Sequence, residues 1–228
     1  MLGGINLMID NLNKINQKFH FDLLSEISKT LKNEGFLFFI TIKPHLDNID
    51  EKASFKEIDY SVISKVVDNI TILQYLWGKY PGPPAPISSI YLINDYIDYV
   101  VAMTPPEKIS VGKPIIAYDW ILPYDDKNLY AISLNINAAT SLAYDMGAII
   151  QFDETSQTPF FQYQTSFGSE TVDHIVWFID VRSLNALYKL SIENNLAGCG
   201  VWKIMVIYQQ VWTLSISQYD IVKLLPEF

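Results

Sequence analysis

The chain has 228 residues, of which half are hydrophobic and 18% are charged, so it is typical of a globular domain with a core and excludes a disordered chain. The formal net charge is −9 and no basic run occurs, which argues against binding to nucleic acid or to anionic lipid. Aromatic residues reach 14%, and such rings either fill a core or line a cleft for flat ligand faces such as those of sugars.

Cysteine and histidine usage predicts neither an internal disulfide nor a metal or cofactor site. Cys199 is the single cysteine, and its apolar neighbours indicate a buried, inert thiol. His20, His45 and His174 lie far apart and have no metal-motif spacing.

No targeting or membrane segment is expected. The start MLGGINLMID has neither a basic region nor a cleavage signal. The longest apolar run, 36–42, is far shorter than the roughly 20 residues that span a bilayer. We therefore expect synthesis in the cytoplasm without a signal or a membrane span.

Predicted strands and helices alternate along the chain. Short apolar runs predict strands over 5–9, 36–42, 70–75, 109–118 and 198–204. Helical periodicity predicts helices over 21–33, 60–67, part of 86–101 (starting at Ser88 or Ser89), 180–194 (with Asp180 as N-cap) and 211–225. Five β/α units predict an α/β fold with a parallel sheet, either doubly wound and open or a barrel with units missing. Nucleotide-binding glycine motifs are absent, so a nucleotide fold gains no support.

Residues 120–174 break this alternation. A helix-like stretch at 137–146 is followed by strand-like stretches at 148–152, 159–165 and 174–178. This pattern predicts a small α+β insertion between the fourth strand and its helix. The proline-rich stretch 81–86 fits a rigid loop better than a ligand for a proline-recognising module.

Several stretches resemble glycoside hydrolase family 18, and most of all its branch of bacterial spore-cortex-lytic glycosidases. They are GINLMIDNL (4–12), GPPAPI (82–87), PPEKISVGKPIIAYDW (105–120), AIIQFDETSQTPFFQY (148–163), HIVWFIDVRSL (174–184) and AGCGVWKI (197–204). The resemblance implies a partial (β/α)8 TIM barrel that begins at strand four. Residues 1–119 would hold strands four to seven, 120–174 the insertion after strand seven, and 175–228 the last helix, strand eight and C-terminal helix. It also implies an association with spores.

The resemblance implies that the catalytic carboxylates are lost. In this family a Glu on strand four protonates the glycosidic oxygen, and an Asp orients the substrate N-acetyl group, which acts as nucleophile. The matching positions read Gly3, Met8 and Asp10. Met8 can hold no charge, and Asp10 is one methylene shorter than Glu, where a displacement of about 1 Å costs on the order of 100-fold in rate. A family Tyr-Asp pair on strand six reads Tyr75-Leu76.

Aromatic residues remain where the family lines its sugar cleft. The resemblance places them at the ends of strands six, seven and eight, as Tyr75, Trp77, Tyr118, Trp120 and Trp202. One departure is Ile116-Ala117, where the branch has Tyr-Gly. Asp119 and Glu154 are further cleft carboxylates, although neither is predicted to act as an acid. Asp10 itself has a plainer alternative as a surface or helix-capping residue.

Three functions follow. The first is a catalytically impaired family 18 domain that binds N-acetylglucosamine-containing glycan, either cortex peptidoglycan or chitin-like. The second is an active glycosidase of the N-acetylglucosaminidase type that uses Asp10 as its acid. The third is a non-catalytic piece of the spore surface or a truncated relic, whose open sheet edges would associate with another copy or a partner chain.

Overall fold

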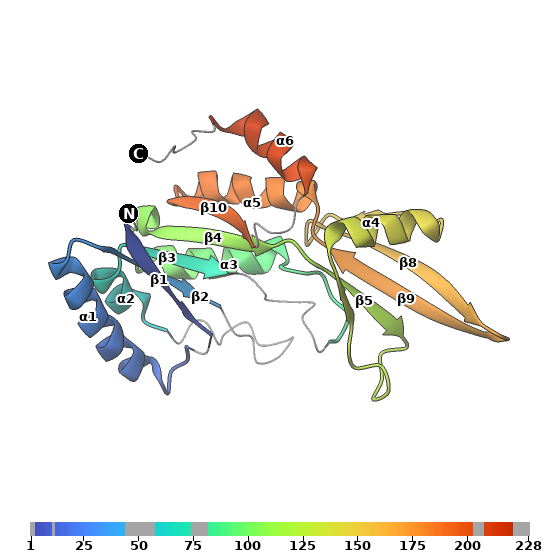
Figure 1. Ribbon diagram of the computed structural model, residues 1–228, viewed down its shortest axis with the longest axis horizontal. Coiled ribbons are helices and arrows are strands. Elements are labelled where there is room, and N and C mark those ends of the chain that lie inside the picture. Colours follow the sequence, from blue (N-terminus) through green and yellow to red (C-terminus); the bar gives the residue numbers. More distant parts are fainter. Residues whose placement is uncertain (1–2, 11, 44–57, 74–81, 203–207, 221–228) are drawn as a thin grey trace.

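The computed structural model describes residues 3–10, 12–43, 58–73, 82–202 and 208–220. These residues form two five-stranded sheets that lie side by side, with the second sheet at the right of Figure 1.

The first sheet is entirely parallel, in the order β1-β2-β3-β4-β10. Its strands are β1 (Gly4–Ile9), β2 (Leu37–Ile42), β3 (Asn69–Leu73), β4 (Ile109–Pro114) and β10 (Gly198–Trp202). The helices between and after them are α1 (Gln17–Asn33), α2 (Tyr60–Val66), α3 (Ile90–Val101), α5 (Val181–Glu193) and α6 (Gln209–Gln218). The predicted parallel arrangement is confirmed.

The two faces of this sheet differ in chemistry. One register row, Ile9, Ile42, Ile72, Val111 and Cys199, lies on the face that packs against the helices. A single apolar core joins this face to α1, α2, α3 and α5. The next row along the strands is mostly polar or small and consists of Met8, Thr41, Thr71, Ser110 and Gly198. Because the core joins these four helices to one face only, the sheet is of the barrel type rather than the doubly wound type.

The second sheet is antiparallel, in the order β6-β5-β9-β8-β7. Its strands are β5 (Ala117–Leu122), β6 (Ile132–Leu134), β7 (Gln151–Asp153), β8 (Thr158–Phe167) and β9 (Glu170–Phe178). Helix α4 (Ile136–Asp145) belongs to the same unit, and Asn135 caps it by accepting a hydrogen bond from the backbone N–H of Ala138. Ala139, Ala143, Phe161 and Val176 share the apolar core of this unit.

The predicted strand over 109–118 is wrong, because two strands occupy this stretch. β4 ends at Pro114, and β5 begins at Ala117 in the other sheet. Proline cannot donate to a strand ladder, which suits a strand end. The second sheet therefore runs from Ala117 to Phe178 and exceeds the predicted segment 120–174 at both ends.

Other predicted elements agree within a few residues. Asp180 caps α5, since its carboxylate accepts from the backbone N–H groups of Arg182 and Ser183. Ser89 is the N-cap residue of α3, without a side-chain hydrogen bond. α6 differs more: it begins two residues before its predicted start and ends at Gln218, seven residues before the predicted end at 225. The short strand β6 was not predicted. None of the described helices could cross a membrane.

Candidate functional site

The carboxyl ends of the parallel strands share one edge of the first sheet, which is where barrels of this type hold their active sites. β1 ends at Ile9, so Asp10 follows directly at this edge, and its side chain is exposed. Within the described part of the chain, the Asp10 carboxylate makes no hydrogen bond or ion pair. The N-cap of α1 is Asn16, so the helix-capping alternative for Asp10 is wrong.

Met8 lies on β1, two residues before Asp10, and is 42% exposed. It pairs in register with Thr41 and so belongs to the polar row of the inner face. A thioether here can neither hold a charge nor orient an amide. Among the described residues, β1 therefore offers a single carboxylate at its end, that of Asp10.

The inner face contains a hollow that the sequence analysis missed. Its volume is about 350 Å³, and its polar lining residues are Asn6, Thr41, Thr71 and Ser110. Thr41 Oγ1 donates a hydrogen bond to Asn6 Oδ1 at 3.0 Å. Gly112, Gly198 and Gly200 line the other side and contribute no side chain. Polar residues at every second position of apolar strands were the signal that could have revealed this hollow.

The lining of this hollow suits neutral polar ligands. Hydroxyl and amide groups both donate and accept hydrogen bonds, whereas the described residues that line the hollow include no carboxylate. These described residues can thus hydrogen-bond the hydroxyl groups of a ligand but supply no general acid. Asp10 is the acid candidate nearest to it along β1.

Tyr118 and Trp120 do not lie at the end of a barrel strand, which corrects their predicted place. Both are on β5 of the second sheet. Trp120 is fully buried, and burial raises the pKa of Tyr118 above its ordinary value. The ring of Trp120 packs edge-on against Tyr124, with 6.1 Å between centroids. The described geometry therefore gives their predicted role in sugar binding no support.

Asp119 belongs to a buried hydrogen-bond network of the second sheet. Tyr163 Oη donates to Asp119 Oδ2 at 2.6 Å, and His174 Nδ1 lies 3.1 Å from Asp119 Oδ1. His174 Nε2 lies 3.1 Å from Thr165 Oγ1, and the rings of Tyr163 and His174 stack. Burial, with the hydrogen bond to Asp119, raises the pKa of Tyr163. Asp119 is thus engaged in packing the sheet.

Glu154, the other carboxylate considered for the cleft, is exposed in the turn after β7 and accepts a hydrogen bond from Gln157 Nε2 at 3.0 Å.

Of the remaining predicted aromatic residues, the structure describes only the backbone of Trp202. Tyr75 and Trp77 lie outside the described residues. The backbone of Trp202 ends β10 at the carboxyl edge, as predicted, but its side chain is outside the description. In the described ranges, no group of His, Cys, Asp and Glu side chains could hold a metal ion.

A parallel sheet with helices on one face, and a candidate site at the strand ends, define a (β/α)8-like protein. Residues 2–205 match the family model described as "Glycosyl hydrolases family 18", and the chain belongs to this family. Cortical fragment-lytic enzyme of Bacillus subtilis is 32% identical over 200 residues, which are 88% of this chain and 46% of that protein. The cortical fragment-lytic enzyme of Bacillus anthracis is also 32% identical, over 195 residues that are 86% of this chain and 45% of that protein.

Solved structures agree with this assignment. The spore cortex-lytic enzyme SleL of Bacillus megaterium matches with a TM-score of 0.81 and 28% identity, over 96% of this chain and 50% of that chain. SleL of Bacillus cereus matches with a TM-score of 0.80 and 29% identity, over 96% and 49%. The chain spans about half the length of the relatives it matches.

Proposed function

We propose that this chain forms strands four to eight of a family 18 barrel, with a second α+β unit after strand seven, and that it binds N-acetylglucosamine-containing glycan with impaired catalysis. The carrying observation is the end of β1, where Met8 and an exposed Asp10 lie at the positions that the sequence resemblance matches to the family's orienting Asp and acid Glu. The relatives whose names refer to spore cortex favour cortex peptidoglycan as the glycan and a spore-associated location.

The inner face supports binding over hydrolysis. Its neutral lining can hydrogen-bond the hydroxyl and amide groups of a sugar, whereas one short carboxylate must do the work that several carboxylates share in the family. Trp202 at the end of β10 and the region of Tyr75 and Trp77 would supply the apolar contacts. An active enzyme with Asp10 as acid is the second candidate, favoured by the exposure of that carboxylate.

The decisive experiment combines binding and turnover in one preparation. Tryptophan fluorescence is followed as chitin oligomers are added, and a chromogenic N-acetylglucosaminide is used to measure release of its leaving group. Saturable binding without release above buffer supports the proposal. Release that disappears in Asp10→Asn establishes the active-enzyme alternative. A folded chain that shows no binding contradicts the proposal. It would favour the third alternative, a non-catalytic structural role.

The polar row of the inner face predicts that the hydroxyl group of Thr41 contributes to glycan binding. Thr41→Val keeps the shape of the side chain but removes the hydroxyl group, so we expect the affinity for chitin oligomers to fall by about 3- to 10-fold, the equivalent of one hydrogen bond. Thr213→Val on the exposed surface of α6 is the matched control and leaves the affinity unchanged. Equal affinities of the two variants would remove the inner face from the binding site.

A further inference from the structure

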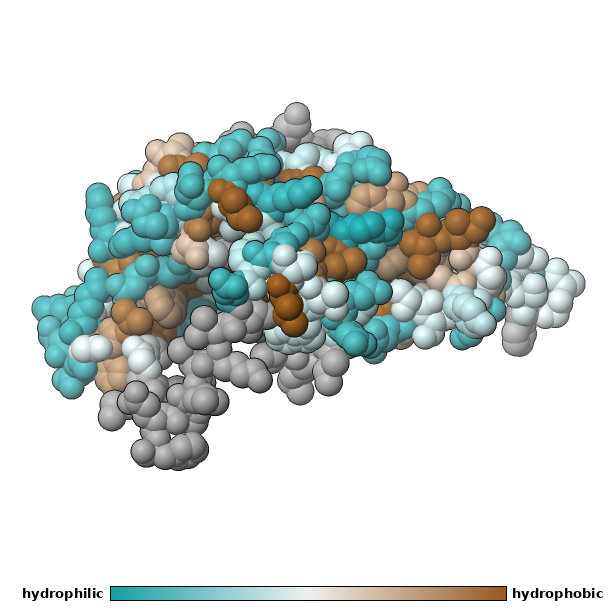
Figure 2. Space-filling view, turned by 90° about the horizontal axis from the view of Figure 1, so that it is seen from above, coloured by the Kyte–Doolittle hydropathy of each residue, from teal (hydrophilic) through white to brown (hydrophobic). Residues whose placement is uncertain are grey.

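The surface of the molecule is mostly hydrophilic on the face that Figure 2 shows. Its apolar patches are separate from one another, and the larger one lies over the second unit. Recognition of a ligand on this face therefore depends mainly on polar and charged groups.

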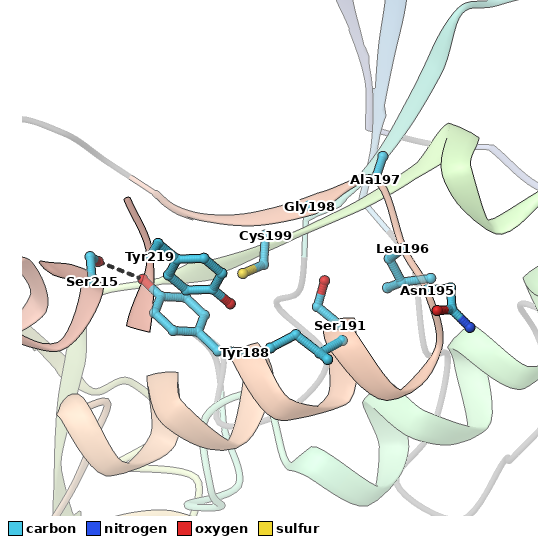
Figure 3. A pocket seen from close by; sticks show the side chains of 10 residues that line it. Tyr188, Ser191, Asn195, Leu196, Ala197, Gly198, Cys199, Ser215 and Tyr219 are labelled. Atoms are coloured by element: carbon cyan, nitrogen blue, oxygen red, sulfur yellow. Dashed lines mark hydrogen bonds between the residues drawn. The ribbon is translucent and has the colours of Figure 1, made fainter. Parts of the chain in front are cut away.

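A polar groove lies beside α5, between this helix, the start of α3 and the turn after β7. Its volume is about 480 Å³, which is within the range of small-ligand sites. The opposite side of α5, with Tyr188 and Ser191, faces β10 and α6 instead (Figure 3). The groove also shares no lining residue with the hollow of the inner face. It is therefore a separate place on the molecule.

The walls of this groove are fastened to each other. Ser183 Oγ donates a hydrogen bond of 2.7 Å to the carbonyl oxygen of Gln157, which joins α5 to the turn after β7. The guanidinium group of Arg182 on α5 lies over the ring of Phe152 on β7, 4.2 Å from the ring centroid. Because both walls are held in place, the groove is preformed, as ligand sites usually are.

Charges of both signs line the groove. Its basic side chains are those of Arg182 and Lys189, and its acidic side chains are those of Glu154 and Glu193. Arg182 Nε donates a hydrogen bond of 2.7 Å to Asp180 Oδ2, which fixes the guanidinium plane, while the arginine side chain stays 48% exposed. The ion pairs of the described residues include neither Lys189 nor Glu193, although these two are four residues apart on α5. Within the described part of the chain, both charges are therefore available to a ligand.

This mixture of charges selects the class of ligand. The two glutamates repel a polyanion. A purely cationic ligand has no need of two basic side chains, since the chain carries 25 acidic against 16 basic residues overall. A ligand with both carboxylate and ammonium groups matches both signs, and the planar fork of Arg182 suits a carboxylate. The uncharged lining residues add amide groups and apolar contact, and they are Ile90, Phe152, Gln157, Asn185, Ala186 and Leu190.

The spacing of the charges indicates the length of such a ligand. Lys189 follows Arg182 by seven residues on α5, and Glu193 follows it by eleven. At about 1.5 Å per residue, these helical spans are about 10 Å and about 16 Å. An extended peptide advances by at most about 3.3–3.6 Å per residue, so a peptide of about three to five residues matches them.

We propose that this groove binds a short zwitterionic peptide. Arg182 and Lys189 hold its carboxylate groups. Glu154 and Glu193 hold its ammonium groups. Peptidoglycan is a glycan that carries short peptides, whereas chitin carries none, so the groove lets the chain recognise the peptide part of peptidoglycan beside its sugar part. In naming peptidoglycan as the source of the peptide, the inference rests on the proposed function.

A ligand-observed NMR titration of the full chain with the tetrapeptide Ala-Glu-Lys-Ala tests the groove. This probe carries carboxylate and ammonium groups and is about 13 Å long when extended. We expect saturable binding that weakens by about 5-fold or more between about 0.05 M and about 0.5 M salt, because exposed charges are screened. The uncharged analogue Ac-Ala-Gln-Gln-Ala-amide should bind far more weakly. A folded chain that does not bind the charged tetrapeptide, or binds both peptides equally, overturns the proposal.

Matched variants locate the binding. Lys189→Gln and Glu193→Gln each remove one exposed charge, and we expect each to weaken tetrapeptide binding by about 2- to 5-fold, as for other exposed ion pairs. Lys29→Gln, at an exposed position of α1, is the control and leaves the affinity unchanged. Circular dichroism checks that all three variants fold. Equal affinities of Lys189→Gln and Lys29→Gln would remove the groove from the binding site.

Chitin oligomers separate this proposal from the proposed function. The groove variants should keep their affinity for chitin oligomers, because the groove shares no lining residue with the inner face. If the tetrapeptide binds and chitin oligomers do not, glycan binding fails and the peptide groove stands. If chitin oligomers bind and the tetrapeptide does not, glycan binding stands and the peptide groove is overturned.

Discussion

Lys113 is a fully buried lysine on β4 whose Nζ donates a hydrogen bond of 3.3 Å to the carbonyl oxygen of Ser183. Burial lowers its pKa from 10.5 to about 7, although the nearby carboxylate of Asp180 opposes this change. Between these two pKa values the unfolded chain binds more protons than the folded chain, so this lysine makes stability rise with pH from about 7 to about 10. Below pH 7 this lysine is charged in the folded chain as well, so the full free-energy cost of burying its charge is present.

Replacement of this lysine should therefore stabilise the fold at neutral pH. We expect Lys113→Met to raise the free energy of unfolding at pH 7 by about 1–4 kcal/mol, as when a buried charge gives way to an apolar side chain of similar volume. The gain should shrink toward pH 10, which urea denaturation at both pH values measures. Lys189→Met, on the exposed side of α5, is the control without a pH-dependent gain. A gain for Lys113→Met that is the same at both pH values would contradict the lowered pKa.

At the scale of single elements, a side-chain cap marks the start of α4. Asn135 Oδ1 accepts a hydrogen bond of 2.8 Å from the backbone N–H of Ala138 at the start of α4. We expect Asn135→Ala to lower the free energy of unfolding by about 1 kcal/mol, whereas Asn135→Asp keeps an acceptor and loses less. Thermal unfolding of the two variants measures the difference. Equal losses would mean that packing alone sets the start of α4.

The elements also show what the sequence could predict. Apolar periodicity and local caps such as Asp180 depend only on residues that are close in the sequence. Most strands and helices of the first sheet could therefore be predicted within a few positions. The apolar residues continue from β4 into β5, and the prediction of one strand over 109–118 passed over Pro114, the local sign of the strand end. For this reason Tyr118 and Trp120 were placed at the wrong strand end. The position of Asp10 directly after β1 could be predicted, because β1 ends by local pattern alone.

The polar networks could not be predicted for a different reason. Asp119 meets Tyr163 and His174, which are 44 and 55 residues away along the chain. The strand register that brings them together is a property of the folded sheet. The polar row of the inner face likewise needs three strands in register before Met8, Thr41 and Thr71 become neighbours.

At the scale of the whole molecule, α5 joins the two units. Leu187 packs in the core of the first sheet, whereas Leu184, one turn earlier, packs in the core of the second. Ser183 Oγ also donates a hydrogen bond of 2.7 Å to the carbonyl oxygen of Gln157 in the second unit. Because one helix contributes to both cores, we infer that the loss of either core releases α5 from the other.

This arrangement predicts a single cooperative unfolding transition. Leu184→Ala and Leu187→Ala each remove a fully buried side chain, and each should cost about 2–5 kcal/mol. Fluorescence includes Trp120 and Trp177 of the second sheet, whereas far-UV circular dichroism reports the helices, most of which cover the first sheet. We expect the two signals to share one midpoint in the parent chain and in both variants. If Leu184→Ala shifted the fluorescence midpoint alone, the second unit would unfold independently, and α5 would not couple the cores.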